Sequence, residues 1–211
     1  MSANEYTPAL GFSGLTPFYD LALRLATRER VWRSRLLRQI APANGEAVLD
    51  VGCGTGTLAV ALKRRAPGAR VVGIDPDPAI LERAAAKAAD AGVQIEWRQG
   101  FAHDVAAYAD EFDKAVCSLV FHQVPLPEKR SGIAAMMKAV RPGGDLHIAD
   151  YATQSTWTMR QLFRTIQLLD GRENTQANAD GALERILDEL ENATAAGPTG
   201  VVKTPTGAIT L

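Results

Sequence analysis

Short apolar runs alternate with stretches of helical periodicity through the central part of the chain. The runs AVLDV, ARVVGID, VQIEWRQG, FDKAVCSLV and DLHIADY have the length and apolar character of buried strands. Between them lie TLAVALKRRAP, an alanine-rich stretch after Asp77-Pro78 and a stretch opening at Pro127, all with helical spacing. Strands that alternate with helices form βαβ units, so the pattern predicts a doubly wound α/β fold with a mostly parallel sheet and helices on both faces.

The two ends of the chain extend this core. Residues 1–15 show no periodicity and are interpreted as a flexible arm, whereas residues 16–42 have the spacing of two helices. Residues 152–211 predict helices on the substrate side and a terminal hairpin, whose antiparallel strand brings the sheet to about seven strands. We therefore expect one domain over residues 16–211, with a ligand-binding core over residues 46–151.

One helical segment after the fifth strand carries an apolar stripe. Its members recur at helical spacing and are Met159, Leu162, Phe163, Ile166 and Leu169. Such a stripe is equally typical of core packing and of a lid that faces a substrate, and both interpretations stay open.

Composition and charge narrow the class of protein. The chain has 211 residues, of which 46% are hydrophobic and 22% charged, and this balance favours a globular domain over a disordered one. The formal net charge of −1 and the lack of a basic stripe disfavour nucleic acid as a partner. The arginines crowded into residues 28–38 are interpreted as the solvated face of a helix.

Cysteine content and the remaining apolar patterns exclude further classes. Cys53 and Cys117 lack metal-ligand spacing, so they predict neither a metal site nor a disulfide framework and are expected to be small buried residues. The N-terminal residues lack the pattern of a secretory signal, and no apolar run has the length of a membrane span. We therefore expect a cytoplasmic protein without stable membrane insertion. The sequence gives no indication of its oligomeric state.

The segment VLDVGCGTG places three glycines at alternate positions directly after the first strand. Gly52, Gly54 and Gly56 permit positive φ angles and let a ligand approach the backbone closely. Open α/β sheets bind ligands at this position, beyond the carboxyl ends of their strands. The spacing G-x-G-x-G differs from the G-x-G-x-x-G of dinucleotide sites, and Asp50 would oppose a diphosphate. The turn therefore favours a ligand that carries positive charge.

A second carboxylate ends the next strand. Asp75 lies about twenty residues beyond the first glycine, where a carboxylate can accept hydrogen bonds from both hydroxyls of a ribose. The alternative role, capping of the next helix, is better filled by Asp77 before Pro78. A cationic nucleoside with a ribose diol and no phosphate fits both carboxylates. S-adenosylmethionine meets this description, because its sulfonium and amino groups are positively charged.

Four segments occur in an order and at a spacing that resemble the class I S-adenosylmethionine-dependent methyltransferases. They are VLDVGCGTG, VVGIDPDPAIL, FDKAVCSLVFHQV and LHIADY after RPGG, and the resemblance extends over residues 16–151. The resemblance is to the group that includes the ubiquinone and menaquinone biosynthesis methyltransferases, often called methyltransferase type 11. It implies a Rossmann-like fold, S-adenosyl-L-methionine as cofactor and transfer of a methyl group.

The resemblance also implies which residues contact the cofactor. They belong to the glycine turn, the ends of the second, third and fourth strands, and an N-terminal lid, and are Asp50, Gly52, Cys53, Gly54, Gly56, Asp75, Pro76, Gly100, Phe101, Ala102, Ser118 and Tyr19. Many relatives have an acid at the position of Phe101, which accepts a hydrogen bond from the adenine amino group. Because Phe101 lacks an acceptor, recognition of adenine is expected from backbone groups, ring packing or Asp104.

The loop after the fourth strand carries the candidate catalytic residue. Histidine side chains can exchange protons near neutral pH. His122 is therefore expected to act as a general base towards the acceptor, and its alternative role is a structural hydrogen bond. Gln123, Asp150 and Tyr151 are expected to line the acceptor pocket. The two other histidines are interpreted as a surface residue (His103) and as sheet packing (His147).

The methyl acceptor is expected to be a small, partly hydrophobic molecule. The apolar stripe after the fifth strand favours this, and the chain lacks the Asn-Pro-Pro-Tyr type of motif found in relatives that methylate nucleobases. Carbon, oxygen, nitrogen, sulfur and arsenic all remain open as the nucleophilic atom. Two other functions stay in contention: a nicotinamide-dependent oxidoreductase, which the glycine spacing disfavours, and a cofactor-binding protein without catalysis.

Overall fold

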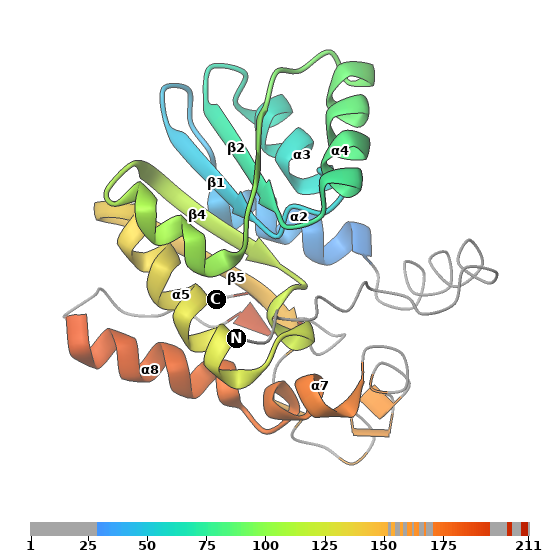
Figure 1. Cartoon of the computed structure of the whole chain (residues 1–211), viewed down its shortest axis with the longest axis vertical. Coiled ribbons are helices and arrows are strands. Elements are labelled where there is room, and N and C mark those ends of the chain that lie inside the picture. The colour runs from blue at the N-terminus through green and yellow to red at the C-terminus, as the bar shows by residue number, and fades with distance from the viewer. Residues whose placement is uncertain are drawn as a thin grey trace, which may run out of the picture.

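A computed structural model shows the core of the chain (Figure 1). The residues that the structure describes are 29–151, 153–154, 157, 160–161, 163–164, 167, 171–194, 202–203 and 208–210. The expected arm, the first N-terminal helix with Tyr19, and every member of the apolar stripe except Phe163 lie outside these residues.

The described strands form one sheet. They are β1 (Ala47–Val51), β2 (Arg70–Asp75), β3 (Glu96–Gln99), β4 (Phe112–Ser118), β5 (Val140–Tyr151), β6 (Val202–Lys203) and β7 (Ala208–Thr210), in the spatial order β3-β2-β1-β4-β5-β7-β6. The first five pair in parallel, while β7 pairs antiparallel with β5 and with β6. The predicted fold class is confirmed, with five parallel strands and the terminal hairpin in the sheet.

Helices cover both faces of this sheet (Figure 1). The described helices are α2 (Glu29–Ile40), α3 (Thr57–Arg65), α4 (Pro78–Asp90), α5 (Leu126–Ala139), α7 (Arg172–Ala179) and α8 (Ala182–Thr194), with 3₁₀ turns η1 (Ala102–Tyr108) and η2 (Phe121–Gln123). Helices α2, α3 and α4 lie on one face, and η1, α5 and α8 lie on the other. Elements on opposite faces pack against alternate residues of the same strands.

Strand β1 illustrates this double burial. Val48 packs in the cluster formed with α2 and α3, whereas Leu49 and Val51 pack in the cluster formed with α5 and α8. Because side chains alternate along a strand, Asp50 shares the face of Val48. This places a carboxylate on the α2 and α3 side of the sheet, next to apolar residues.

The start of α4 confirms the predicted cap. Asp77 Oδ1 accepts hydrogen bonds from the backbone N–H groups of Ala79 and Ile80, at 2.9 and 3.4 Å, and Pro78 occupies the first turn. These bonds satisfy two of the amide groups that a helix leaves without partners at its start. Asp75 is therefore not needed as a cap.

The end of α5 differs from the prediction. Helical spacing predicts one apolar face made of Ile133, Met136, Met137 and Val140. Ile133 and Met136 are buried, but Val140 is the first residue of β5 rather than the last residue of this face. Val140 has extended dihedral angles, with φ −83° and ψ 132°. The proline at position 142 restricts Arg141 before it to extended conformations, so the helix ends here and the strand starts early.

In the part of the chain that the structure describes, no helix combines the length and apolar character needed to span a bilayer. Within the same described ranges, no three His, Cys, Asp or Glu side chains are grouped so that they could bind a metal ion.

Candidate active site

The carboxyl ends of the five parallel strands meet at one edge of the sheet and bring the candidate residues together. The segments that follow or end these strands are residues 52–56, 75–76, 100–102, 118–123 and 150–151. Four strand ends, those of β2, β1, β4 and β5, are consecutive neighbours in the sheet. Ligands of open α/β sheets bind at this edge.

The glycine turn between β1 and α3 requires its glycines for two different reasons. Gly52, Gly54 and Gly56 have φ angles of 66°, 53° and 72°, in the left-handed region that favours glycine. A Cβ on Gly52 would lie 2.4 Å from Val120 Cγ2, and one on Gly56 would lie 2.6 Å from Trp97 Cη2. A Cβ on Gly54 would meet no atom of the described residues within 4 Å. The outer glycines permit close packing, and Gly54 leaves the middle of the turn accessible.

Asp75 holds the glycine turn from the neighbouring strand. Its Oδ2 accepts a hydrogen bond from the Gly54 N–H at 3.0 Å, and its Oδ1 accepts one from the Asp77 N–H at 3.1 Å. Burial raises the pKa of Asp75 above its ordinary value, while these two amides act in the opposite direction. Each carboxylate oxygen can accept more than one hydrogen bond, so Asp75 can hold the turn and still receive hydroxyl groups.

Asp50 is a buried carboxylate without a well-formed hydrogen bond. It is 1% exposed, and among the described residues neither Oδ atom has a hydrogen-bond partner of good geometry. Burial raises the pKa of Asp50 to about 7, although the charge of Arg33 and the backbone N–H of Ala59 act to lower it. A buried polar group without a partner is unfavourable, and a cationic ligand group would relieve this cost. Asp50 therefore fits a ligand that carries an ammonium or sulfonium group.

Arg33 is a site residue that the sequence did not reveal. It belongs to α2, is half-buried, and its guanidinium carbon lies 5.1 Å from the centroid of the Trp32 ring. Arg35 and Arg38 of the same helix are exposed, as predicted for the whole arginine cluster. The charge of Arg33 acts directly on Asp50. A guanidinium and a carboxylate in one place complement the carboxylate and ammonium of an amino acid.

Segment 100–102 lies at the end of β3. Phe101 is 44% exposed, so the core position that its residue type alone would indicate is wrong. Its ring stacks on the ring of His103 at a centroid distance of 5.6 Å, and its N–H donates to Asp104 Oδ2 at 2.8 Å. Asp104 thus fastens the start of η1, and the exposed Phe101 ring remains available to pack against a flat ligand group. A Cβ on Gly100 would lie 3.0 Å from Ile74 Cδ1, so this position has little room.

His122 and Asp150 form a buried pair between the loop after β4 and the end of β5. His122 Nδ1 lies 2.9 Å from Asp150 Oδ1. Asp150 Oδ2 also accepts from the N–H groups of Val120 and His122, at 3.1 and 3.3 Å. A carboxylate that accepts from Nδ1 favours the tautomer with its proton there, which makes Nε2 the basic nitrogen.

Further contacts of Asp150 favour a positioning role over contact with an acceptor. Its Oδ1 also accepts from the Tyr151 N–H at 2.7 Å and from Asn178 Nδ2 at 3.4 Å. The Tyr151 ring meets the His122 ring edge-on at 4.9 Å and the Phe163 ring at 5.3 Å. The only described member of the apolar stripe, Phe163, is thus buried beside Tyr151.

The remaining candidates have simpler surroundings. Ser118 is half-buried at the end of β4 and pairs with Ala149 of β5, while the side chain of Gln123 is exposed. Cys53 and Cys117 are buried free thiols as predicted, and burial raises the pKa of both, so neither is a thiolate at neutral pH. His147 is buried in β5, where burial lowers its pKa, as expected for sheet packing.

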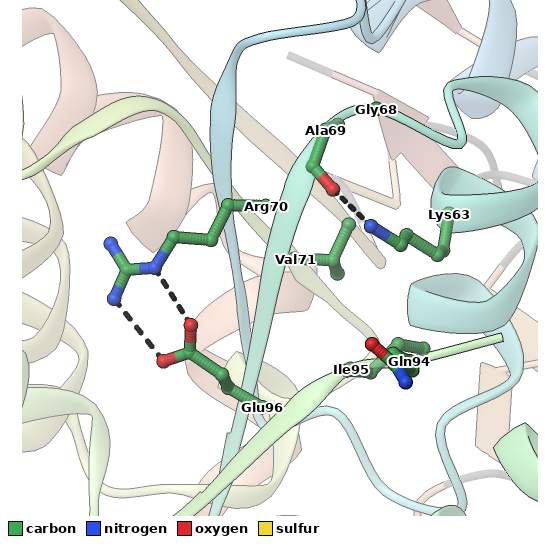
Figure 2. Close-up of a pocket in the computed structure, with 8 residues that line it drawn as sticks. All are labelled: Lys63, Gly68, Ala69, Arg70, Val71, Gln94, Ile95 and Glu96. Atoms are coloured by element: carbon green, nitrogen blue, oxygen red, sulfur yellow. Dashed lines mark hydrogen bonds and ion pairs between the residues drawn. The ribbon is translucent and has the colours of Figure 1, made fainter.

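A pocket elsewhere in the molecule is distinct from this site. Figure 2 shows it at the start of β2 and β3, the edge of the sheet opposite the glycine turn. Its charged groups are engaged: Arg70 pairs with Glu96, with Nε 2.8 Å from Oε1, and Lys63 donates to the Ala69 carbonyl. This pocket contains none of the predicted site residues.

Comparisons with known proteins indicate a methyltransferase domain. The family described as "Methyltransferase domain" matches residues 48–144. A demethylmenaquinone methyltransferase of Deinococcus radiodurans is 30% identical over 155 residues, covering 72% of this chain and 64% of the relative. A ubiquinone biosynthesis O-methyltransferase of Hahella chejuensis is 41% identical over 103 residues, covering 48% of this chain and 42% of the relative. The chain thus spans less than two thirds of the length of these relatives.

A solved structure has the same fold over almost the whole chain. A possible exported protein from Bordetella parapertussis aligns with a TM-score of 0.68 and 22% identity, covering 98% of this chain and 74% of that one. The family match identifies residues 48–144 as a methyltransferase domain, and the fold, the glycine turn and these relatives together support the class I S-adenosylmethionine-dependent methyltransferases as the class of the chain. The cofactor of this class is S-adenosylmethionine.

Proposed function

We propose that the protein transfers the methyl group of S-adenosylmethionine to a small molecule with a partly hydrophobic, quinone-type or phenolic ring. The observation that supports the proposal most is the buried Asp50 carboxylate, which accepts no well-formed hydrogen bond from the described residues, together with the room around Gly54. A cationic ligand that approaches the backbone satisfies both features, whereas a diphosphate would meet the negative charges of Asp50 and Asp75.

The contacts with the cofactor divide by chemical group. Asp50 would accept from its amino group, Arg33 would receive its carboxylate, and Asp75 would accept from the ribose hydroxyls. The exposed Phe101 ring would pack on adenine, together with the backbone of residues 100–102 and Pro76. Each role follows from the charge and exposure of the residue. Ser118 and the glycine turn would contact the cofactor through their backbone groups.

The acceptor side would be formed by the loop after β4. S-adenosylmethionine supplies an activated methyl group, so the residues of the chain need only orient the acceptor and remove its proton. Such orientation lowers a barrier by about 7–11 kcal/mol in favourable cases. His122, held by Asp150, would take the proton on Nε2, and Tyr151 and Phe163 would border the ring of the acceptor.

The names of two relatives support the ring chemistry of the acceptor. One is named a demethylmenaquinone methyltransferase and the other a ubiquinone biosynthesis O-methyltransferase. The aromatic cluster of His122, Tyr151 and Phe163 is consistent with a flat ring as the group recognised. The formal net charge of −1 makes a small molecule a better acceptor than a nucleic acid.

The proposed function is tested by turnover. Purified protein is incubated with S-adenosylmethionine and a panel of phenols, catechols and quinols, and the formation of S-adenosylhomocysteine is measured. Acceptor-dependent product supports the proposal. If S-adenosylhomocysteine binds but no acceptor of the panel gives product, the protein is better described as a cofactor-binding protein, and this proposal is wrong.

Replacement of His122 by alanine separates catalysis from cofactor binding. We expect turnover to fall by about a hundredfold or more, which is the usual contribution of a positioned general base. Affinity for S-adenosylhomocysteine, measured by calorimetry, should stay near the wild-type value. The reason is that Asp150 holds the loop by accepting from the Val120 and His122 backbone N–H groups, and these hydrogen bonds do not need the His122 side chain. Equal losses of turnover and affinity in His122→Ala would assign His122 to the cofactor site instead.

A further inference from the structure

Lys129 is a buried lysine that the proposed chemistry does not use. It lies in the first turns of α5 and is 0% exposed. Its Nζ donates to three backbone carbonyls, those of Phe121, Val124 at 2.6 Å and Asn174 at 3.2 Å. An ammonium group has three N–H donors and no acceptor, so its donors match these three carbonyls in number.

The charge state of Lys129 suits this role at neutral pH. Burial lowers the pKa of Lys129 to about 8, while the carboxylate of Asp150 acts to raise it. The side chain is therefore mainly protonated at pH 7, and the three-donor form dominates. A buried ammonium without such partners would be strongly unfavourable, so the carbonyls and the lysine require one another.

The three carbonyls all belong to the loop that carries His122 or to the helix beside it. Phe121 and Val124 stand on either side of His122, and Asn174 belongs to α7. Asn174 also links α7 to the loop through its side chain, because its Nδ2 donates a hydrogen bond to the Gln123 carbonyl at 2.9 Å. Lys129 thus joins α5, the loop after β4 and α7, and within the described part of the chain its Nζ donates to these three carbonyls and not to the glycine turn.

We propose that Lys129 is a positioning residue: by holding the carbonyls on either side of His122, it fixes the loop of residues 119–125 against Asp150 and so sets the acceptor side of the site. The assignment to an acceptor side rests on the proposed function. The fixing of the loop does not, and it can be measured without cofactor or acceptor.

The primary test is Lys129→Met, which keeps a long apolar side chain and removes the donors. Hydrogen exchange of the ligand-free protein is followed at the Val120 and His122 amides, which donate to Asp150. We expect their exchange to rise about tenfold or more, since hydrogen bonds made by charged groups are the stronger ones. Exchange in residues 52–56 and the affinity for S-adenosylhomocysteine should be unchanged, whereas kcat should fall by a similar factor.

Lys138→Met is the matched control, because Lys138 is exposed in the last turn of the same helix. It should leave loop exchange, affinity and kcat unchanged. Wild-type exchange at Val120 and His122 in folded Lys129→Met would overturn the proposal, and so would an affinity loss equal to the loss of kcat. If the wild type neither binds S-adenosylhomocysteine nor turns over, the proposed function fails, while the exchange result still decides whether Lys129 fixes the loop.

A second variant covers the case in which Lys129→Met does not fold. Asn174→Ala removes the amide that donates to Gln123 but keeps the backbone carbonyl that accepts from Lys129. Asn174 is half-buried, so this change is mild. We expect a smaller rise in exchange, confined to residues 119–125. Unchanged exchange there would contradict the view that these ties to α7 fix the loop.

Discussion

Replacement of Asp50 by asparagine is expected to stabilise the ligand-free protein at pH 8 and to weaken its binding of S-adenosylhomocysteine. The ionised carboxylate is buried and accepts no well-formed hydrogen bond within the described residues, so removal of its charge relieves a free-energy cost. A pKa raised from 3.8 to about 7 corresponds to about 4 kcal/mol of unfolding free energy at pH 8. The amide also has unfulfilled hydrogen bonds, so we expect a gain of about half that size.

The contribution of Asp50 to the unfolding free energy is expected to fall as the pH rises. Because the pKa of Asp50 is higher in the folded protein than its ordinary value, the folded state binds the proton more tightly. The stability associated with this proton is complete below about pH 4 and is lost as the pH rises to about 7. Asp50→Asn should therefore differ most from the wild type above pH 7, in urea unfolding followed by circular dichroism.

Loss of the carboxylate should also remove the partner of the ligand ammonium. We expect affinity for S-adenosylhomocysteine to fall by about ten- to a hundredfold, the effect of losing a hydrogen bond between charged groups. Asp113→Asn is the matched control: Asp113 is a buried strand aspartate, but it accepts from the Ala47 N–H at the opposite edge of the sheet. Wild-type affinity in Asp50→Asn would show that Asp50 does not contact the ligand.

Replacement of Asp75 by alanine is expected to have the largest effect on cofactor affinity. The change removes the acceptor of the Gly54 N–H and, in the proposed complex, the acceptor of two ribose hydroxyls. Losing several such bonds together should weaken binding of S-adenosylhomocysteine by about a hundredfold or more, as measured by calorimetry.

Asp77→Ala is the control for Asp75→Ala. Asp77 lies two residues further along and caps α4 with bonds to Ala79 and Ile80. Its loss should lower the unfolding free energy by about 1 kcal/mol and leave cofactor affinity nearly unchanged. If the two variants lost affinity equally, the effect of Asp75 would reflect the local stability of α4 rather than contact with ribose.

The parts of the site that the sequence predicted depend on local chemistry. The three alternate glycines were enough to predict positive φ angles in the turn, and Asp77-Pro78 was enough to predict the N-terminal cap of α4. Both predictions were possible because the residues involved are near one another in the chain. The position of Asp75 follows from its place at the end of a strand. In each case, a few adjacent residues determine the structure.

Arg33 could not be assigned from the sequence because its partner is distant in the chain. An arginine among arginines is typical of a solvated face, and Arg35 and Arg38 are indeed exposed. The charge of Arg33 acts on Asp50 because α2 packs against β1 in the folded chain. Helix α7 was missed for a related reason: its sequence, RENTQANA, has no apolar stripe. Its contacts are made by asparagine amides, which donate to the Gln123 carbonyl in the loop after β4 and to the Tyr151 carbonyl at the end of β5.

The helical spacing around Lys129 predicts a buried position, whereas its residue type predicts an exposed one. It precedes Ile133 by four residues and Met136 by seven, so helical spacing alone places it on the buried face of α5. Lysine is almost never fully buried without partners, which favours an exposed position. The carbonyls that satisfy it come from the loop after β4 and from α7, and these contacts exist only in the folded chain.

The central claim is that the glycine turn with Asp50 and Asp75 binds S-adenosylmethionine rather than a dinucleotide. Calorimetric titration of the wild-type protein with S-adenosylhomocysteine, and separately with NADH, tests it most directly. We predict saturable binding of one S-adenosylhomocysteine per chain and no heat of binding with NADH. Saturable binding of NADH, with no binding of S-adenosylhomocysteine, would contradict the account.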